Sequence, residues 1–218
     1  MQTAGKQRAR LVSPEYWFHD LIRVTGGPPG LLWFRPKKLY ADGAAREKIR
    51  GGALIISNHA TNFDPLYLML TIWYRRHHFV CLRSFFNGRF QGWLFRHFLC
   101  IPIDRENASL ETIRTITDHL RRGELVSMFP EGHITRENEA ASLRGGMVLI
   151  ASQAGTPIIP VHICKRAHWY SRLRVVIGAP VSPASPDGGR PGMQQLEQLV
   201  GRLENEMKRL ASLAGESR

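Results

Sequence analysis

The sequence contains no uninterrupted apolar segment long enough to cross a bilayer. A membrane-spanning helix needs roughly 20 consecutive, mostly apolar residues. The longest candidate, residues 66–74, is about half that length and runs directly into Arg75 and Arg76. The first ten residues are basic but have no apolar stretch behind them, so a secretory signal peptide is not expected. We therefore expect neither a spanning helix nor a leader.

Cysteine is scarce as well. The three cysteines, Cys81, Cys100 and Cys164, are odd in number, scattered along the chain and without metal-ligand spacing. This pattern excludes a disulfide framework and indicates reduced thiols, as in a cytosolic protein. No metal site is expected from it.

Acidic residues are absent between Asp64 and Asp104. The whole chain has 30 Lys and Arg against 18 Asp and Glu, a formal net charge of +12, and residues 1–105 hold 16 of the basic but only 6 of the acidic residues. The acid-free stretch contains the arginines Arg75, Arg76, Arg83, Arg89 and Arg96, and aromatic residues that include Trp73, Tyr74, Phe79, Phe85, Phe86, Phe90, Trp93, Phe95 and Phe98.

Three interpretations of this basic and aromatic stretch compete. Arginines and rings together can bind single-stranded nucleic acid, or they can lie on an anionic membrane surface, with the rings in the headgroup layer and the arginines on lipid phosphates. Alternatively, the rings belong to the core and the arginines to a solvated face. The motifs described below favour the membrane for the stretch as a whole.

The 218 residues, 43% of them hydrophobic and 22% charged, suit one globular domain. Short apolar runs alternate with segments of helical periodicity, which predicts an α/β fold: a single domain with a mixed, largely parallel sheet flanked by helices. Strands are predicted at 53–57, 79–82, 98–103, 125–129, 157–163 and 173–177, and helices at 65–74, 110–120, 146–154 and 196–210.

Residues 1–34 are predicted to form a short amphipathic, membrane-facing segment, and residues 35–218 the main domain. The spacing within 16–22 is helical, and the run Gly-Gly-Pro-Pro-Gly at 26–30 is expected to break the chain. The apolar residues 31–34, followed by Arg35, Lys37 and Lys38, form either an interfacial anchor or a hydrophobic lid on the domain.

The most informative motif directly follows the predicted strand 53–57. Its polar residues include Asn58, His59 and Asp64, and open α/β sheets place their sites at the carboxyl ends of strands. A carboxylate five residues from an imidazole can fold back to fix its tautomer and stabilise the imidazolium. No serine or cysteine nucleophile lies near this pair, so it suits activation of a substrate hydroxyl. Alternatively, Asp64 only caps a helix whose first residue is Pro65.

Two further strands end in polar motifs. The strand 125–129 runs into Pro130, Glu131 and Gly132, where a glycine allows close approach of the backbone to a ligand. Arg136 and Arg144 follow, and Gly145 and Gly146 open a helix, which together make a plausible phosphate site. Arg105 follows the strand 98–103. Each of these arginines, taken alone, is better explained by a surface salt bridge.

In this order the motifs resemble those of the glycerolipid acyltransferases, typified by 1-acyl-sn-glycerol-3-phosphate (lysophosphatidic acid) acyltransferase. The four blocks are His59 to Asp64 (H-x-x-x-x-D), the arginine block ending at Arg105, the F-P-E-G block at 129–132, and an apolar strand with an internal proline at 156–161. The resemblance covers roughly residues 35–180. One block alone is weak, whereas four in order are specific.

The resemblance implies an enzyme that moves a fatty acyl group from acyl-CoA or acyl carrier protein to a glycerol hydroxyl of 1-acyl-sn-glycerol-3-phosphate, giving phosphatidate. His59 would be the general base and Asp64 its orienting partner. The acceptor would be held by residues of the later blocks. These substrate-binding candidates are Asn58, Arg105, Phe129, Pro130, Glu131, Gly132, Arg136 and Arg144.

The resemblance also implies the partners and the location of the enzyme. We expect no cofactor or metal, a lysophospholipid acceptor, a thioester donor, and peripheral attachment to the cytoplasmic face of an anionic membrane. One departure concerns the acceptor: many relatives have F-P-E-G-T-R, whereas here Arg136 stands four residues after Gly132. Another lysophospholipid acceptor is therefore the alternative, and a basic nucleic-acid-binding protein a distant one.

Overall fold

The computed structural model describes residues 16–59, 61–104, 109–130, 137–183 and 192–215, with only the backbone described for 137–144. Seven strands form one sheet in the order β1-β7-β6-β2-β5-β3-β4. They are β1 (Lys37–Tyr40), β2 (Ala53–Ser57), β3 (His77–Leu82), β4 (Cys100–Ile103), β5 (Leu125–Met128), β6 (Ile158–Ile163) and β7 (Arg174–Ile177). The helices are α1 (Trp17–Phe34), α2 (Asp64–Thr71), α3 (Arg89–His97), α4 (Leu110–Arg121), α5 (Glu137–Ala154) and α6 (Met193–Leu213), with two short 3-10 turns at Ala44–Arg46 and Arg83–Phe86.

The sheet is mixed but largely parallel, as predicted. Strands β6, β2, β5, β3 and β4 run parallel to one another, and β7 pairs with β6 in the antiparallel sense. Strand β1 was not predicted from the sequence, because its four residues include two lysines and none is fully buried. It pairs with β7 in parallel at the edge of the sheet.

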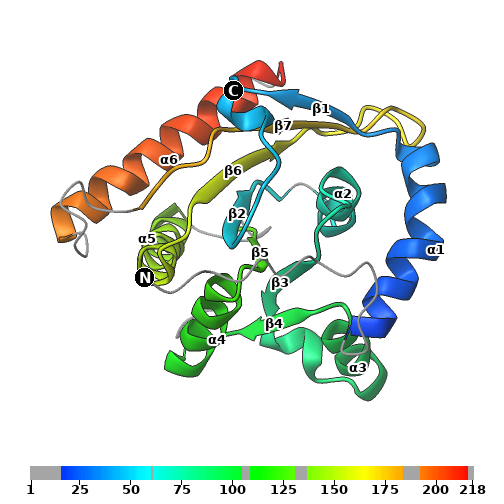
Figure 1. Ribbon diagram of the computed structural model, residues 1–218, viewed down its shortest axis with the longest axis horizontal. Helices are drawn as coiled ribbons and strands as arrows, with labels where there is room; N and C mark the ends of the chain where they lie inside the picture. The colour runs from blue at the N-terminus through cyan, green and yellow to red at the C-terminus, as the bar shows by residue number, and fades with distance from the viewer. Residues whose placement is uncertain (1–15, 60, 105–108, 131–136, 184–191, 216–218) are drawn as a thin grey trace.

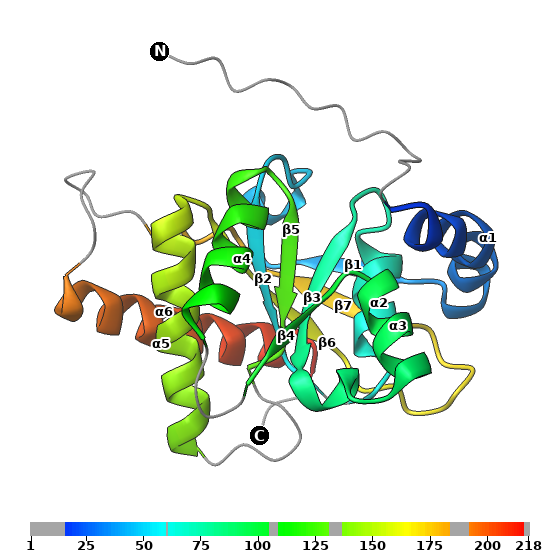
Figure 2. The same ribbon diagram turned by 90° about the horizontal axis from the view of Figure 1, so that it is seen from below.

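Helices cover both faces of the sheet (Figures 1 and 2). Helices α4, α5 and α6 lie on one side, and α1, α2 and α3 on the other. Alternation along β2 explains the two layers: Leu54 and Ile56 face α4, α5 and α6, whereas Ala53 and Ile55 face α2. All five residues of β2 are buried, as expected of a central parallel strand that is covered on both faces.

Local signals explain where several helices start and stop. The Ser109 side chain accepts a hydrogen bond from the Thr112 backbone N–H and caps α4, as N-terminal serines often do. Helix α5 ends before Gly155, whose φ of +67° lies in the left-handed region that favours glycine. The predicted helices at 110–120 and 196–210 and the predicted strands are confirmed within a few residues.

The N-terminal segment differs from the prediction. Residues 26–30 do not break the chain: α1 continues through Pro28 and Pro29 to Phe34. Each proline removes one backbone N–H, but the surrounding turn of α1 is largely exposed, so water can bond to carbonyl groups that lose a partner there. Helix α3 lies at the edge of the sheet, beside β4, and was not predicted.

Candidate active site

The first predicted pair is assembled at the carboxyl end of β2. His59 lies two residues beyond this strand, and Asp64 is the first residue of α2. The Nδ1 atom of His59 is 2.9 Å from Oδ2 of Asp64. The carboxylate is fully buried, whereas the imidazole is about a fifth exposed. A proton on Nδ1 is therefore directed at Asp64, and Nε2 carries the lone pair that can accept a proton.

Thr61 completes the surroundings of the carboxylate. Its backbone N–H donates to Oδ2 of Asp64 at 2.8 Å, and its hydroxyl donates to Oδ1 at 2.8 Å. Asp64 thus receives hydrogen bonds from the loop and from His59, which satisfies the requirement that a buried charge be paired. Asp64 is not the N-cap of α2, a position that Phe63 occupies without a side-chain hydrogen bond.

Asn58 joins two strands. Its Nδ2 donates to the Ile163 carbonyl oxygen at 3.0 Å, and its Oδ1 accepts from the Ile163 N–H at 2.7 Å. This pair of bonds ties the loop that carries His59 to the end of β6. The structure therefore shows Asn58 fixing the start of that loop, while a contact with substrate stays a prediction.

Phe129, the first residue after β5, lies beside the His59–Asp64 pair. The ring of Phe129 is tilted by 30° against the imidazole of His59, with centroids 4.7 Å apart. Pro130, the next residue, is buried. Strands β2 and β5 are parallel neighbours, so their carboxyl ends meet at one edge of the sheet, and this places Phe129 and Pro130, the described half of the F-P-E-G block, beside the His59–Asp64 pair.

The remaining predicted substrate-binding residues cannot be placed in the same way. Arg105, Glu131, Gly132 and Arg136 lie outside the described residues. Arg144 belongs to α5, but its side chain is not among those described. Their roles stay predictions.

The arginines of the acid-free stretch are not one free surface patch. Arg75 donates hydrogen bonds to the carbonyl oxygens of Ile49, Gly51 and Gly123. Arg76 is paired with the buried carboxylate of Asp20 at 2.7–2.8 Å. Both side chains hold loops and α1 in place, which gives them a structural role, and their binding of lipid phosphates stays a prediction.

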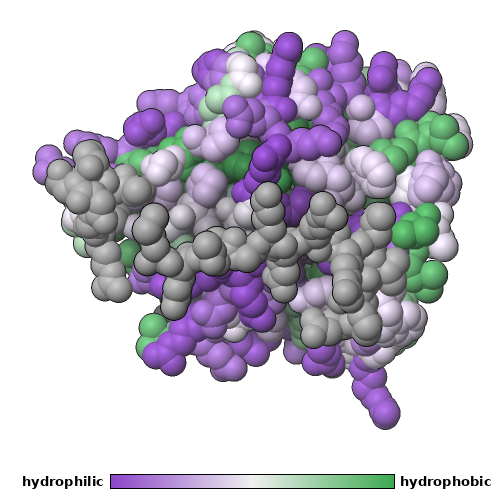
Figure 3. Space-filling view, in the orientation of Figure 1, coloured by the Kyte–Doolittle hydropathy of each residue, from purple (hydrophilic) through white to green (hydrophobic). Residues whose placement is uncertain are grey.

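Exposed apolar side chains gather instead on α1 and α3. Trp17, Leu21 and Val24 are spaced along one face of α1, and all three are about half exposed. Figure 3 shows hydrophobic side chains along the side of the molecule where α1 lies. On α3, Phe90 is 74% exposed and stacks on Trp93.

The N-terminal end of α1 connects these two helices. The Phe18 ring meets the Trp93 ring edge-on, with centroids 5.1 Å apart. The apolar faces of α1 and α3 therefore adjoin one another. Within the described residues, no helix combines the length and the apolar character needed to traverse a bilayer.

Comparison with known proteins decides the family. The model of the family described as Acyltransferase matches residues 39–164, which is more than half of the chain. The chain belongs to the Acyltransferase family. The match includes His59, Asp64 and Phe129, which the structure brings together at the carboxyl edge of the sheet, and it also spans the rest of the 129–132 block.

Curated relatives of this acyltransferase are similar along most of its length. The chain is 27% identical over 170 residues to "1-acyl-sn-glycerol-3-phosphate acyltransferase" of Bacillus subtilis, which covers 73% of this chain and 84% of the relative. It is 26% identical over 163 residues to the protein of the same name from Streptococcus pneumoniae, covering 72% of this chain and 60% of that one. The enzyme class predicted from the motifs is therefore confirmed.

The fold is likewise similar to a solved structure. The crystal structure of the 1-acyl-sn-glycerophosphate (LPA) acyltransferase PlsC from Thermotoga maritima matches with a TM-score of 0.54. The match covers 90% of this chain and 81% of that one, at 18% identity. At this identity the likeness supports the predicted α/β fold.

Sequence reasoning missed one residue of the site. Thr61 lies between His59 and Asp64 and donates two hydrogen bonds to the carboxylate. The only signal in the sequence is a threonine three residues before an aspartate, a spacing at which the side chains can bond locally. That signal is common in turns, so it singles out Thr61 only once the loop is seen.

Proposed function

We propose that this acyltransferase moves a fatty acyl group from acyl-CoA or acyl carrier protein to the free hydroxyl of 1-acyl-sn-glycerol-3-phosphate, giving phosphatidate. The observation that carries the proposal is the 2.9 Å contact between His59 and a fully buried Asp64, in a chain of the Acyltransferase family. The names of the relatives support the choice of acceptor.

The chemistry needs a base but no protein nucleophile. Nε2 of His59 takes the proton of the acceptor hydroxyl while the hydroxyl oxygen forms a bond to the thioester carbonyl carbon. The tetrahedral intermediate then expels the thiolate, which receives the proton from the imidazolium, and the new ester is released. Asp64 stabilises the positive charge that His59 carries between these two proton transfers.

Recognition of the phosphate is proposed for residues that follow β4 and β5. Arg105 follows β4 by two residues, and Glu131 and Gly132 follow Pro130. Because β2, β5, β3 and β4 are consecutive parallel neighbours, their carboxyl ends share one edge with His59. Guanidinium groups suit a phosphate monoester there, since they bind phosphate oxygens in bidentate fashion. Arg136 and Arg144 are further candidates for the acceptor phosphate or the donor.

We propose further that the enzyme meets its lipid substrate at an anionic membrane surface through α1 and α3. The apolar face formed by Trp17, Leu21, Val24 and Phe90 would enter the headgroup layer. Arg89 and Arg96, which are both exposed on α3, would contact lipid phosphates. This replaces Arg75 and Arg76 in that role with residues whose side chains are at the surface.

The acceptor is the part of the proposal that most needs a direct test. Purified enzyme is assayed with lysophosphatidate, lysophosphatidylethanolamine and lysophosphatidylglycerol, each with acyl-CoA and with acyl-loaded carrier protein. We expect turnover of lysophosphatidate to exceed that of the others. Faster turnover of another lysophospholipid would assign the acceptor differently while keeping the reaction, and no turnover of any acceptor would overturn the proposal.

A further inference from the structure

Two histidines and a glutamate come together at the edge of the sheet remote from the His59–Asp64 pair. His78 is the second residue of β3, His119 lies in the last turns of α4, and Glu124 directly precedes β5. Parallel strands begin at one edge of the sheet and end at the other, so these residues lie at the amino edge, whereas His59 follows the carboxyl end of β2. The cluster is therefore separate from the site of acyl transfer.

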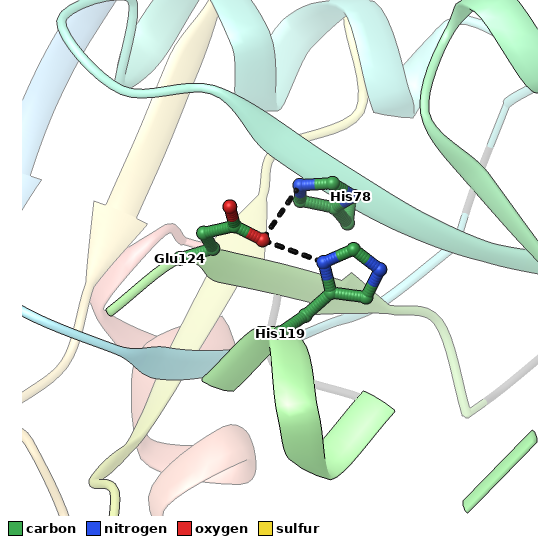
Figure 4. Close-up of side chains that lie close together, drawn as sticks. All are labelled: His78, His119 and Glu124. Carbon is green, nitrogen blue, oxygen red and sulfur yellow. Dashed lines mark hydrogen bonds and ion pairs between the residues drawn. The ribbon is translucent and has the colours of Figure 1, made fainter. Parts of the chain in front are cut away.

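One carboxylate oxygen of Glu124 contacts both imidazole rings (Figure 4). Oε2 of Glu124 is 3.2 Å from Nε2 of His78 and 2.5 Å from Nδ1 of His119. One candidate ligand atom from each residue lies within 4.8 Å of the other two. We propose that this cluster binds one transition-metal ion, Zn²⁺ being the best match, with His78, His119 and Glu124 as ligands.

The donor set selects the class of ion. Two imidazole nitrogens and one carboxylate oxygen are ligands typical of zinc, whereas Mg²⁺ and Ca²⁺ require mostly oxygen. Around zinc the three donors would sit about 2.0–2.2 Å from the ion, which places them roughly 3.3–3.5 Å apart in a tetrahedron. The distance between Glu124 and His78 is already close to that spacing, whereas the donor atoms of Glu124 and His119 would have to separate by about 1 Å, so binding needs side-chain movement within the cluster.

The surroundings hold the three ligands in place. The Glu124 backbone N–H donates to the His119 carbonyl oxygen, and the turn between them includes Gly123 at a φ of +84°. Arg75 fixes the same turn through the Gly123 carbonyl oxygen at 2.6 Å. The Tyr16 hydroxyl donates to Oε1 of Glu124 at 3.4 Å. Such outer hydrogen bonds orient metal ligands.

The site is open on one side. The side chain of His78 is 4% exposed, whereas those of His119 and Glu124 are 16% and 26% exposed. An ion can therefore enter from solvent and keep water as its remaining ligand. Because the ligands belong to β3, α4 and the start of β5, the ion would link three elements and stabilise the folded chain.

The test is to titrate the whole, chelator-treated chain with Zn²⁺ alone. Calorimetry measures the number of ions bound, and thermal unfolding measures the change in the unfolding midpoint. We expect one equivalent to bind and the midpoint to rise. His119→Gln and Glu124→Gln should each weaken binding at least tenfold and abolish the rise. His168→Gln, at an exposed histidine outside the cluster, is the matched control and should bind like the wild type.

Two results would overturn the proposal. One is the absence of a bound equivalent of Zn²⁺ in the wild type, which would make the cluster a hydrogen-bonded ion pair only. The other is unchanged binding in both His119→Gln and Glu124→Gln, which would place the ion elsewhere. His119 is the primary variant because it is partly exposed and its loss leaves the core intact. Neither readout depends on acyl transfer, so the proposed function stands or fails independently.

Discussion

The hydroxyl of Thr61 donates a hydrogen bond of 2.8 Å to Oδ1 of Asp64, the carboxylate oxygen that does not face His59. Thr61 therefore holds the partner of the proposed base, His59, rather than His59 itself, which makes it a positioning residue. Its backbone N–H donates to the other oxygen, so the loop fixes the carboxylate from both sides.

Thr61→Val should lower kcat by about tenfold and leave KM nearly unchanged. A tenfold loss corresponds to ~1.4 kcal/mol, near the lower end for a hydrogen bond to a charged group. Thr61→Ser keeps the hydroxyl and should restore most of the activity. Steady-state kinetics of the two variants check this, and equal kcat values for Val and Ser would exclude the hydroxyl from positioning.

The ion pair between Arg76 and Asp20 should contribute far more to stability than the pair between Arg83 and Asp104. Asp20 is fully buried, whereas both side chains of the second pair are about half exposed. Arg76→Ala leaves a buried carboxylate with a weaker partner and should cost about 3 kcal/mol of unfolding free energy. Arg83→Ala should cost less than ~1 kcal/mol.

Urea denaturation of the two arginine variants measures this difference. Helix α1 carries Asp20, so the Arg76→Ala variant should also lose the packing of α1 against the domain. Similar unfolding free energies for both variants would contradict the assignment of Arg76 to structure and would reopen its role at a lipid surface.

Membrane binding should depend on the apolar face of α1 and α3. Replacing Leu21 and Phe90 together by serine removes two exposed apolar side chains, each worth about 1.5–3 kcal/mol when fully buried. Flotation with vesicles containing phosphatidylglycerol should show at least a ~tenfold weaker association. Leu110→Ser is the matched control, because Leu110 is 72% exposed but lies on α4.

Two flotation results would contradict the proposal that α1 and α3 form the membrane contact. If the double variant floats like the wild type, α1 and α3 do not form the membrane contact. If Leu110→Ser loses binding to the same extent, the effect reflects general apolar exposure and the proposed surface is again contradicted.

His19 should make the stability of the protein depend on pH in the acidic range. Burial lowers the pKa of this histidine from 6.5 to about 4. The groups facing it are Asp20 and Arg23 on α1, Arg76 before β3, and His77 on β3. Between these two pKa values the unfolded chain binds more protons, so stability should fall as the pH drops from about 6.5 to about 4.

The loss assigned to His19 should be of the order of 3 kcal/mol, measured by denaturant unfolding at a series of pH values. His19→Gln removes one titrating group and should make this part of the profile less steep, while His77, whose pKa burial lowers to about 3, keeps the remaining slope. A profile as steep in His19→Gln as in the wild type would assign the pH dependence to other groups.

The sequence predicts the sheet and the dyad well, for reasons that are local. The buried run of β2 and the polar residues behind it mark a strand and its site without knowledge of the rest of the chain. His59 and Asp64 are five residues apart, so a single loop can join them. Phe129 reaches the same place because β5 is the parallel neighbour of β2.

Contacts between distant segments were not predictable in this way. Arg76 looks like a surface charge until α1 brings Asp20 against it, 56 positions earlier in the chain. Continuation of α1 through Pro28 and Pro29 contradicts the usual rule for proline. His78, His119 and Glu124 show no metal-ligand spacing, because only the pairing of β3 with β5 and the end of α4 brings them together.

The rate of phosphatidate formation by the His59→Ala variant tests the central claim most directly. Wild type, His59→Ala and the control His168→Ala are assayed with lysophosphatidate and acyl-CoA, after circular dichroism confirms that each is folded. Loss of the general base should lower kcat by roughly 10²–10⁴-fold, while His168→Ala retains wild-type turnover. A folded His59→Ala variant with wild-type turnover would contradict the account.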